Sequence, residues 1–82
     1  MAAEDHYTLN SLKKAIRLLR SFTVDEPEKG ISELAKSLQM PKSTVQRMVM
    51  TLADEGFLQK NPQTQRYRLG MSILGLSGVI TS

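Results

Sequence analysis

Apolar residues recur at intervals of three and four along most of this chain, which predicts a largely helical domain. The first such stretch runs from Thr8 to Phe22, and the Thr8 hydroxyl is suited to cap its first turn. Pro27 and Gly30 then interrupt the pattern and predict a loop. The residues expected to face the core from this helix are Leu9, Leu12, Ala15, Ile16, Leu19 and Phe22.

Two further helices follow in close succession. The first comes after Ile31, with Ser32 as its expected cap. The second begins near Pro41. Proline has no backbone N–H, and it is tolerated in the first turn of a helix because N–H groups there have no intrahelical partner. This helix continues to about Glu55, and Gly56 suits the left-handed position that ends many helices. The buried stripe of the shorter helix is expected to be Leu34, Ala35 and Leu38.

The rest of the chain predicts a β-hairpin and one more helix. Residues 57–69 contain two runs of strand-forming residues, separated by Asn61-Pro62-Gln63-Thr64. That tetrapeptide suits a type I turn with proline at its second position. After Gly70, the segment MSILGLSGVI predicts an apolar helix. The order is therefore helix, helix, helix, hairpin, helix, a mainly α fold with a small β-hairpin.

The helix expected over residues 41–55 has two contrasting sides. At about 100° per residue, Val45, Met48, Val49 and Leu52 share a core face. A helix N-terminus presents unpaired N–H groups that favour phosphate, and Arg and Gln side chains can pair with the edges of guanine and adenine. This pattern favours a recognition helix in a major groove, although helix caps and ordinary surface residues would look the same. The residues on the outer side and its flanks are Lys42, Ser43, Thr44, Gln46, Arg47, Met50 and Thr51.

The segment that joins the second and third helices has the helix-turn-helix pattern. Small Ala35 stands where two helices must approach, and apolar Met40 stands in the turn. Gln39 occupies a position where such turns commonly have Gly. A left-handed conformation at Gln39 would cost roughly 1 kcal/mol.

The hairpin carries positive charge. Arg66 and Arg68 alternate with Tyr67 and Leu69, so we expect both guanidinium groups to leave the face that packs on the helices. Lys60 joins them near the turn. These residues predict a wing that grips a phosphate backbone or a minor groove, and the alternative is a hairpin that only covers the core.

Charge and composition narrow the classes of function. The chain has 82 residues, no Cys, a single His and a formal net charge of +3. Basic residues gather in segments 13–20, 42–47 and 60–68, apart from the acidic ones, which fits either a nucleic-acid face or solvated helix faces. His6 lies alone near the N-terminus, so we expect no metal, no cofactor and no enzymatic activity. The absence of Cys and of a run of about 20 apolar residues favours a cytoplasmic protein without a membrane partner.

Three segments of the chain resemble the N-terminal domain of the IclR (isocitrate-lyase-regulator) type of bacterial transcription factor. They are SLKKAIRLLRSF, GISELAKSLQMPKSTVQRMVMTLADEGFL and NPQTQRYRLG, which together span most of residues 11–70. The resemblance implies a winged helix-turn-helix that binds specific sequences of double-stranded DNA, with helix 41–55 in the major groove and hairpin 57–69 as the wing. Gln65 departs from the usual Gly of the family in that turn. The positions that the resemblance assigns to DNA are Lys42, Ser43, Thr44, Gln46, Arg47, Arg66 and Arg68.

The resemblance also implies a division of the chain and a set of partners. We expect residues 1–7 to be disordered, residues 8–70 to form the winged helix-turn-helix, and residues 71–82 to begin a linker helix. That helix would lead to an absent C-terminal domain that binds a small-molecule effector. The full-length regulator would be a homodimer or higher homo-oligomer on a pseudo-palindromic operator. The apolar residues of segment 71–82 would then be covered by the rest of the protein or by a second subunit.

Two other classes of function are compatible with the same fold. A winged helix can serve as a protein–protein interaction module without DNA-binding activity, because a fold does not determine a function. Such a module needs no segregation of basic residues. RNA binding is a weaker alternative, because no aromatic residue stands among the basic ones to stack on bases.

Overall fold

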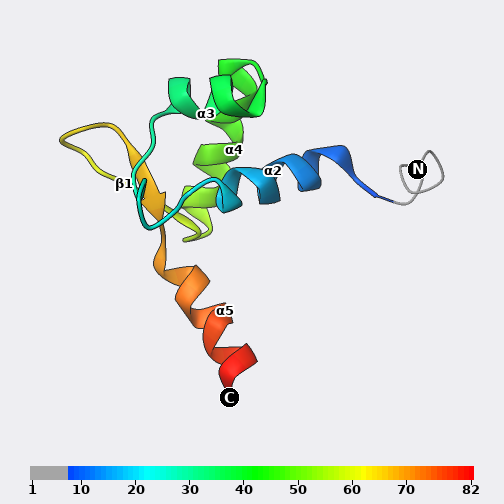
Figure 1. The fold of residues 1–82 in the computed structure, drawn as a ribbon, viewed down its shortest axis with the longest axis vertical. Coiled ribbons are helices and arrows are strands. Elements are labelled where there is room, and N and C mark those ends of the chain that lie inside the picture. The colour runs from blue at the N-terminus through cyan, green and yellow to red at the C-terminus, as the bar shows by residue number, and fades with distance from the viewer. Residues whose placement is uncertain (1–7) are drawn as a thin grey trace.

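Four helices and one two-stranded hairpin make up the described part of the chain. The structure is a computed structural model that describes residues 8–82, so the expectation of disorder for residues 1–7 and the position of His6 lie outside the described residues. Three helices gather on one side of the hairpin, and the last helix extends away from it (Figure 1). The predicted order and fold class are confirmed. The elements are α2 (Asn10–Arg20), α3 (Ile31–Leu38), α4 (Lys42–Asp54), β1 (Leu58–Lys60), β2 (Tyr67–Leu69) and α5 (Met71–Thr81).

The core lies where α2, α3 and α4 meet the hairpin. Each helix contributes at least one side chain with no exposed surface, namely Leu18 from α2, Leu34 from α3, and Val45 and Val49 from α4. Burial of an aliphatic side chain of this size contributes about 1.5–3 kcal/mol, so these four residues anchor the domain. The other buried members of the core are Phe22, Ala35, Leu38, Met40, Leu58 and Tyr67.

The first helix turns a different side to the core from the one predicted. Leu18 and Phe22 are buried there, with Leu19 packed against them. The first part of the predicted stripe is wrong, because three of its leucine and isoleucine side chains lie roughly 120–180° around the helix from Leu18. These side chains are exposed by 68 %, 57 % and 42 % and belong to Leu9, Leu12 and Ile16, respectively.

Both predicted helix caps differ from the observed ones. The first helix begins at Asn10, with Leu9 rather than Thr8 in the capping position. The second begins one residue before Ser32, with Gly30 in the capping position. There the Glu33 side chain accepts a hydrogen bond from the Gly30 N–H at 2.9 Å, so Glu33 rather than Ser32 supplies the side-chain acceptor at the start of this helix.

The turn between α3 and α4 follows the predicted pattern. Gln39 has φ 56° and ψ 49°, the left-handed conformation that glycine usually supplies. The Met40 N–H donates to the Ala35 carbonyl at 3.0 Å, and its side chain is buried. Pro41 occupies the position before the first residue of α4 without a capping hydrogen bond, and Gly56 ends the helix with φ 82°, so both predicted boundaries are confirmed.

The hairpin is short and joined to the segment before α3. Its antiparallel register pairs Leu58 with Leu69 and Lys60 with Tyr67. The Gln65 N–H, rather than that of Thr64, closes the turn on the Asn61 carbonyl at 2.8 Å, so the connection is longer than the predicted four-residue turn. Lys29 forms an isolated bridge to Tyr67, which places residue 29 beside β2 as a third extended segment.

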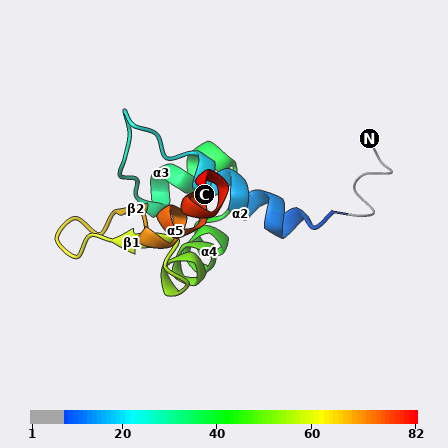
Figure 2. The same cartoon turned by 90° about the horizontal axis from the view of Figure 1, so that it is seen from below.

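The last helix starts from a tight junction with the end of α4. The Ser72 hydroxyl donates to the Glu55 carbonyl at 3.1 Å, and the Ser72 N–H donates to the Gly56 carbonyl at 3.1 Å. Beyond this junction α5 projects away from the core, and its apolar residues are largely exposed. Seen along α5, the hairpin and the N-terminal end of α2 lie on opposite sides of the molecule (Figure 2). Across residues 8–82, the helices are too short or too polar to span a membrane.

Candidate nucleic-acid interface

The start of α4 presents a polar, cationic face to solvent. Its core side holds Val45 and Val49, which fixes the opposite side outward. Within residues 8–82, the salt bridges engage neither Lys42 nor Arg47, so both cations are available to an anionic partner. Of the predicted α4 contacts, four are exposed and Thr44 is half-buried. The exposed four are Lys42, Ser43, Gln46 and Arg47.

The backbone at the same end of α4 adds hydrogen-bond donors. The first turn of a helix leaves its N–H groups without intrahelical partners, and no side chain caps α4 among the described residues. The first intrahelical bond of this region is that of the Val45 N–H to the Pro41 carbonyl, at 3.1 Å. The free N–H groups, the partial positive charge of the helix end and Lys42 together make a local environment that attracts phosphate.

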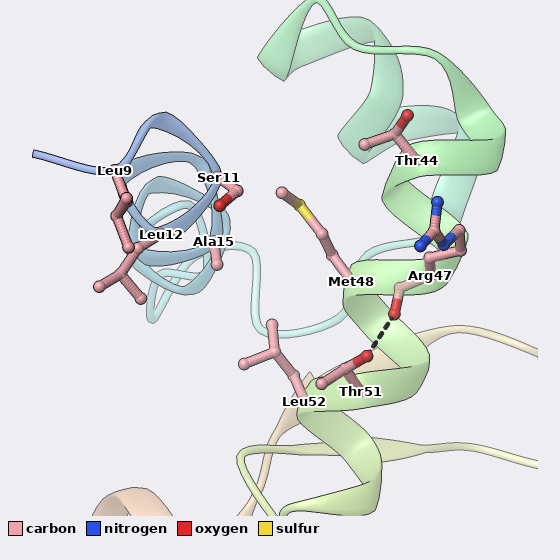
Figure 3. Close-up of a pocket in the computed structure, with 9 residues that line it drawn as sticks. All are labelled: Leu9, Ser11, Leu12, Ala15, Thr44, Arg47, Met48, Thr51 and Leu52. Atoms are coloured by element: carbon pink, nitrogen blue, oxygen red, sulfur yellow. Dashed lines mark hydrogen bonds between the residues drawn. The ribbon is translucent and has the colours of Figure 1, made fainter.

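An apolar groove lies between α2 and α4, beside the polar face. Its volume is about 610 Å³, and Met48 and Leu52 point from α4 toward α2 across it (Figure 3). Leu12 and Ala15 line the α2 side, while Thr44 and Arg47 line its edge on α4. One turn along α4, the Thr51 hydroxyl donates to the backbone carbonyl of Arg47 at 2.8 Å.

The two faces of the hairpin are chemically different. Cross-strand partners share a face, so Gln59 and Arg68 point away from the buried Tyr67. Arg68 is exposed, as predicted, and borders a groove of about 390 Å³ with residues 22–27. Lys60 lies on the other face, where its Nζ is 5.9 Å from the centre of the Tyr67 ring.

That second face points toward α4. A groove of about 700 Å³ runs between the hairpin and α4, and Lys60, Gln65, Gln46 and Met50 line it. Lys60 and Gln65, together with Tyr67, are therefore the hairpin residues that share this groove with the outer side of α4. Sequence alternation gave no signal for this pairing, because it depends on the angle at which the hairpin packs.

Arg66 does not leave the face that packs on the helices, which corrects the expectation from alternation. Its Nη2 lies 2.7 Å from Glu33 Oε1 and donates to the Glu28 carbonyl at 2.8 Å. Residue 66 precedes the paired part of β2, so the alternation of a strand does not control its side chain. Whether Arg66 contacts DNA stays a prediction, but its charge is already paired within the protein.

Comparison with known proteins gives a consistent result over most of the chain. The family model of the IclR helix-turn-helix domain matches residues 11–62. The glycerol operon regulatory protein of Streptomyces coelicolor is 35% identical over 68 residues, which are 83% of this chain and 27% of that protein. The transcriptional regulator XynR of Escherichia coli is 30% identical over 66 residues, 80% of this chain and 26% of that protein. The chain thus spans about a quarter of the length of these relatives.

Solved structures show the same likeness. The crystal structure of an IclR family transcriptional regulator from Brucella abortus superposes with a TM-score of 0.85 and 31% sequence identity. The match covers 92% of this chain and 28% of that structure.

Proposed function

This chain belongs to the IclR helix-turn-helix domain family, and on that premise we propose that it recognises specific sequences of double-stranded DNA through α4 and the hairpin. DNA binding in transcription regulation is the function that the family and the named regulators share. The observation that carries the proposal is the polar, uncapped and unpaired N-terminal face of α4, backed by two fully buried valines that keep it outward.

The residues of α4 divide into two roles. Lys42, Ser43 and Thr44 stand at the helix N-terminus, where a phosphate oxygen can accept hydrogen bonds from backbone and side chains together. Gln46 and Arg47 stand one turn further along, where their longer side chains reach base edges in a major groove. The hairpin acts as the wing, with Lys60 and Arg68 as its exposed cations.

Selection of binding sites from a random duplex pool tests this proposal. We expect enrichment of one sequence, and we expect Arg47→Ala to weaken binding to it by about 1–3 kcal/mol and to relax selectivity at one base pair. Because Val45 and Val49 carry the packing, the variant should unfold at the temperature of the wild type. A uniform loss across all sequences would make Arg47 a phosphate contact, and a pool without enrichment would contradict sequence-specific binding.

We propose further that two copies bind one operator. The second apolar side of α2, formed by Leu9, Leu12 and Ile16, and the exposed apolar residues of α5 support pairing between copies. A symmetric pair requires a pseudo-palindromic operator, with half-sites about 34–36 Å apart or a multiple of that distance. Sedimentation with and without the selected DNA tests this, and a single copy bound at saturating protein would exclude the pair.

The domain division and the remaining partners are also proposals. Residues 8–70 would be the DNA-binding unit and residues 71–82 the start of a linker helix. The greater length of the regulators supports a further domain that binds a small-molecule effector. A DNA target and bacterial relatives support a cytoplasmic location, and the regulators' names support a role other than catalysis. A protein-interaction module without DNA binding has no observation in its favour.

A further inference from the structure

The hairpin is held to the segment before α3 by contacts that converge on one arginine. The Arg66 Nη2 reaches Glu33 Oε1 at 2.7 Å and the Glu28 carbonyl at 2.8 Å. The same Glu33 Oε1 accepts the Gly30 N–H at 2.9 Å, so a single carboxylate oxygen joins the wing to the first turn of α3. Two backbone hydrogen bonds support the same junction. The Lys29 N–H donates to the Tyr67 carbonyl at 2.9 Å, and the Tyr67 N–H donates to the Lys29 carbonyl at 2.8 Å.

The surroundings of Arg66 leave its charge little freedom to serve another partner. The side chain is 42% exposed, and its Nε is buried without a hydrogen-bond partner. Both bonds engage the same nitrogen, Nη2, so a phosphate contact through that nitrogen would cost at least one of them. The opposing Glu33 would also remain close to the DNA and repel it.

We infer that Arg66 is a positioning residue, which sets the angle of the wing against the helix-turn-helix through Glu33 rather than by contacting DNA. This inference rests on the proposed function, because it assigns a role within DNA binding. Lys60 and Gln65 lie on the hairpin face that shares a groove with Gln46 of α4. Release of the hairpin from α3 would move these residues away from α4, and DNA affinity would fall without loss of a phosphate contact.

The sign of the effect of Glu33 separates this role from direct contact. Removal of a negative charge near DNA normally strengthens DNA binding. Loss of the contact between Arg66 and Glu33, which we call the clamp, should instead weaken DNA binding. We therefore expect Glu33→Gln and Arg66→Ala each to weaken binding to the selected site by roughly threefold to tenfold. Glu33→Gln keeps an oxygen that can accept the Gly30 N–H, so the cap of α3 remains available.

The salt dependence of binding provides the second measurement. The salt slope is the slope of the logarithm of the DNA-binding constant against the logarithm of the salt concentration. Lys42→Ala is the control for an exposed cation at the interface, and it should lower the magnitude of this slope by about one unit. Arg66→Ala should leave the slope unchanged. Combination of Arg66→Ala with Glu33→Gln should be no worse than Arg66→Ala alone, because Arg66→Ala already removes the ion pair that Glu33→Gln weakens.

Rescue by lysine and hydrogen exchange complete the test. Arg66→Lys should bind DNA more tightly than Arg66→Ala, because lysine can still pair with Glu33. This gain should disappear when the change is combined with Glu33→Gln. If residue 66 contacted a phosphate, lysine would restore DNA affinity with either residue at position 33. Arg66→Ala should also speed exchange of the Lys29 and Tyr67 amides and leave the Val49 amide unchanged.

Tighter binding by Glu33→Gln, or a slope lowered by about one unit in Arg66→Ala, would overturn the positioning role and make Arg66 a phosphate contact. Absence of DNA binding by the wild-type chain is a separate outcome. It would remove the proposed function and this inference with it, even if the amide exchange showed that the clamp itself exists.

Discussion

Replacement of Gly70 by alanine should destabilise the domain strongly, because the backbone of another segment occupies the place of its side chain. A Cβ at residue 70 would stand 2.2 Å from the Gly56 carbonyl oxygen and 3.1 Å from the Leu58 nitrogen. Real Cβ atoms do not approach other heavy atoms within 3.0 Å. The φ of Gly70 is −95°, which any residue adopts, so the penalty is steric rather than conformational.

The size of this penalty follows from what must move apart. Separation of residues 56 and 70 stretches two backbone hydrogen bonds. In the first, the Gly70 N–H donates to the Phe57 carbonyl at 2.8 Å, and in the second, the Ser72 N–H donates to the Gly56 carbonyl. Two backbone hydrogen bonds contribute about 1–3 kcal/mol, and overpacking typically costs a further 1–3 kcal/mol. We expect a loss of roughly 2–6 kcal/mol, which lowers the midpoint of thermal unfolding by at least about 8 °C in a domain of this size.

Thermal unfolding followed by circular dichroism provides the assay, and Gly75→Ala is the matched control. A Cβ at residue 75 meets nothing within 4 Å, and alanine favours a helix interior by about 0.5–1 kcal/mol over glycine. The control should therefore retain or raise helical content. If Gly70→Ala unfolded within about 2 °C of the wild type, the close packing of residues 56 and 70 would be refuted.

Three other changes test the interface and the turn. Lys60 lies on the hairpin face toward α4, and Lys60→Ala should lower the magnitude of the salt slope of DNA binding by about one unit. If the slope were unchanged in both Lys60→Ala and Arg68→Ala, the wing would not contact DNA. Gln39→Gly should stabilise the chain by roughly 0.5–1 kcal/mol in urea unfolding, because it relieves a left-handed residue at the cost of some backbone entropy. Gln63→Gly, at a residue without positive φ, is its control and should destabilise the chain instead. Leu12→Ser on the outer side of α2 should weaken self-association in sedimentation, whereas Lys14→Ser should not.

The helix-turn-helix was predictable because local chemistry marks its limits. Proline is confined to few backbone conformations, whereas glycine readily adopts the left-handed one that ends a helix, and Pro41 and Gly56 stand where the structure begins and ends α4. The apolar stripe of α4 is equally unambiguous, since its other side is almost entirely polar. The side chains of Val45 and Val49 could therefore point only into the core, and the residues on the opposite side of α4 had to face solvent.

The orientation of α2 was not predictable in the same way. This helix carries apolar residues on both sides, so its periodicity fits two faces, and the predicted face, which contains Leu12, is the exposed one. Only the packing of Leu18 against α3 and α4 decides between them. Arg66 is a similar case, because its partner Glu33 is remote in sequence and is brought to it by the bridge between Lys29 and Tyr67.

The hairpin is fixed to the helices at both of its ends, and this has a mechanical consequence. The contacts of Arg66 and Lys29 hold β2 to the segment before α3, while Gly70 and Ser72 hold its end to the last turn of α4. The wing and the recognition helix therefore form one body, and α5 departs from the same junction. A rotation of α5 about residues 70–72 cannot be absorbed there without loss of the Ser72 bonds to Glu55 and Gly56. The contacts of Ser72 therefore join the start of α5 to the C-terminal end of α4, which is the end opposite to its polar face.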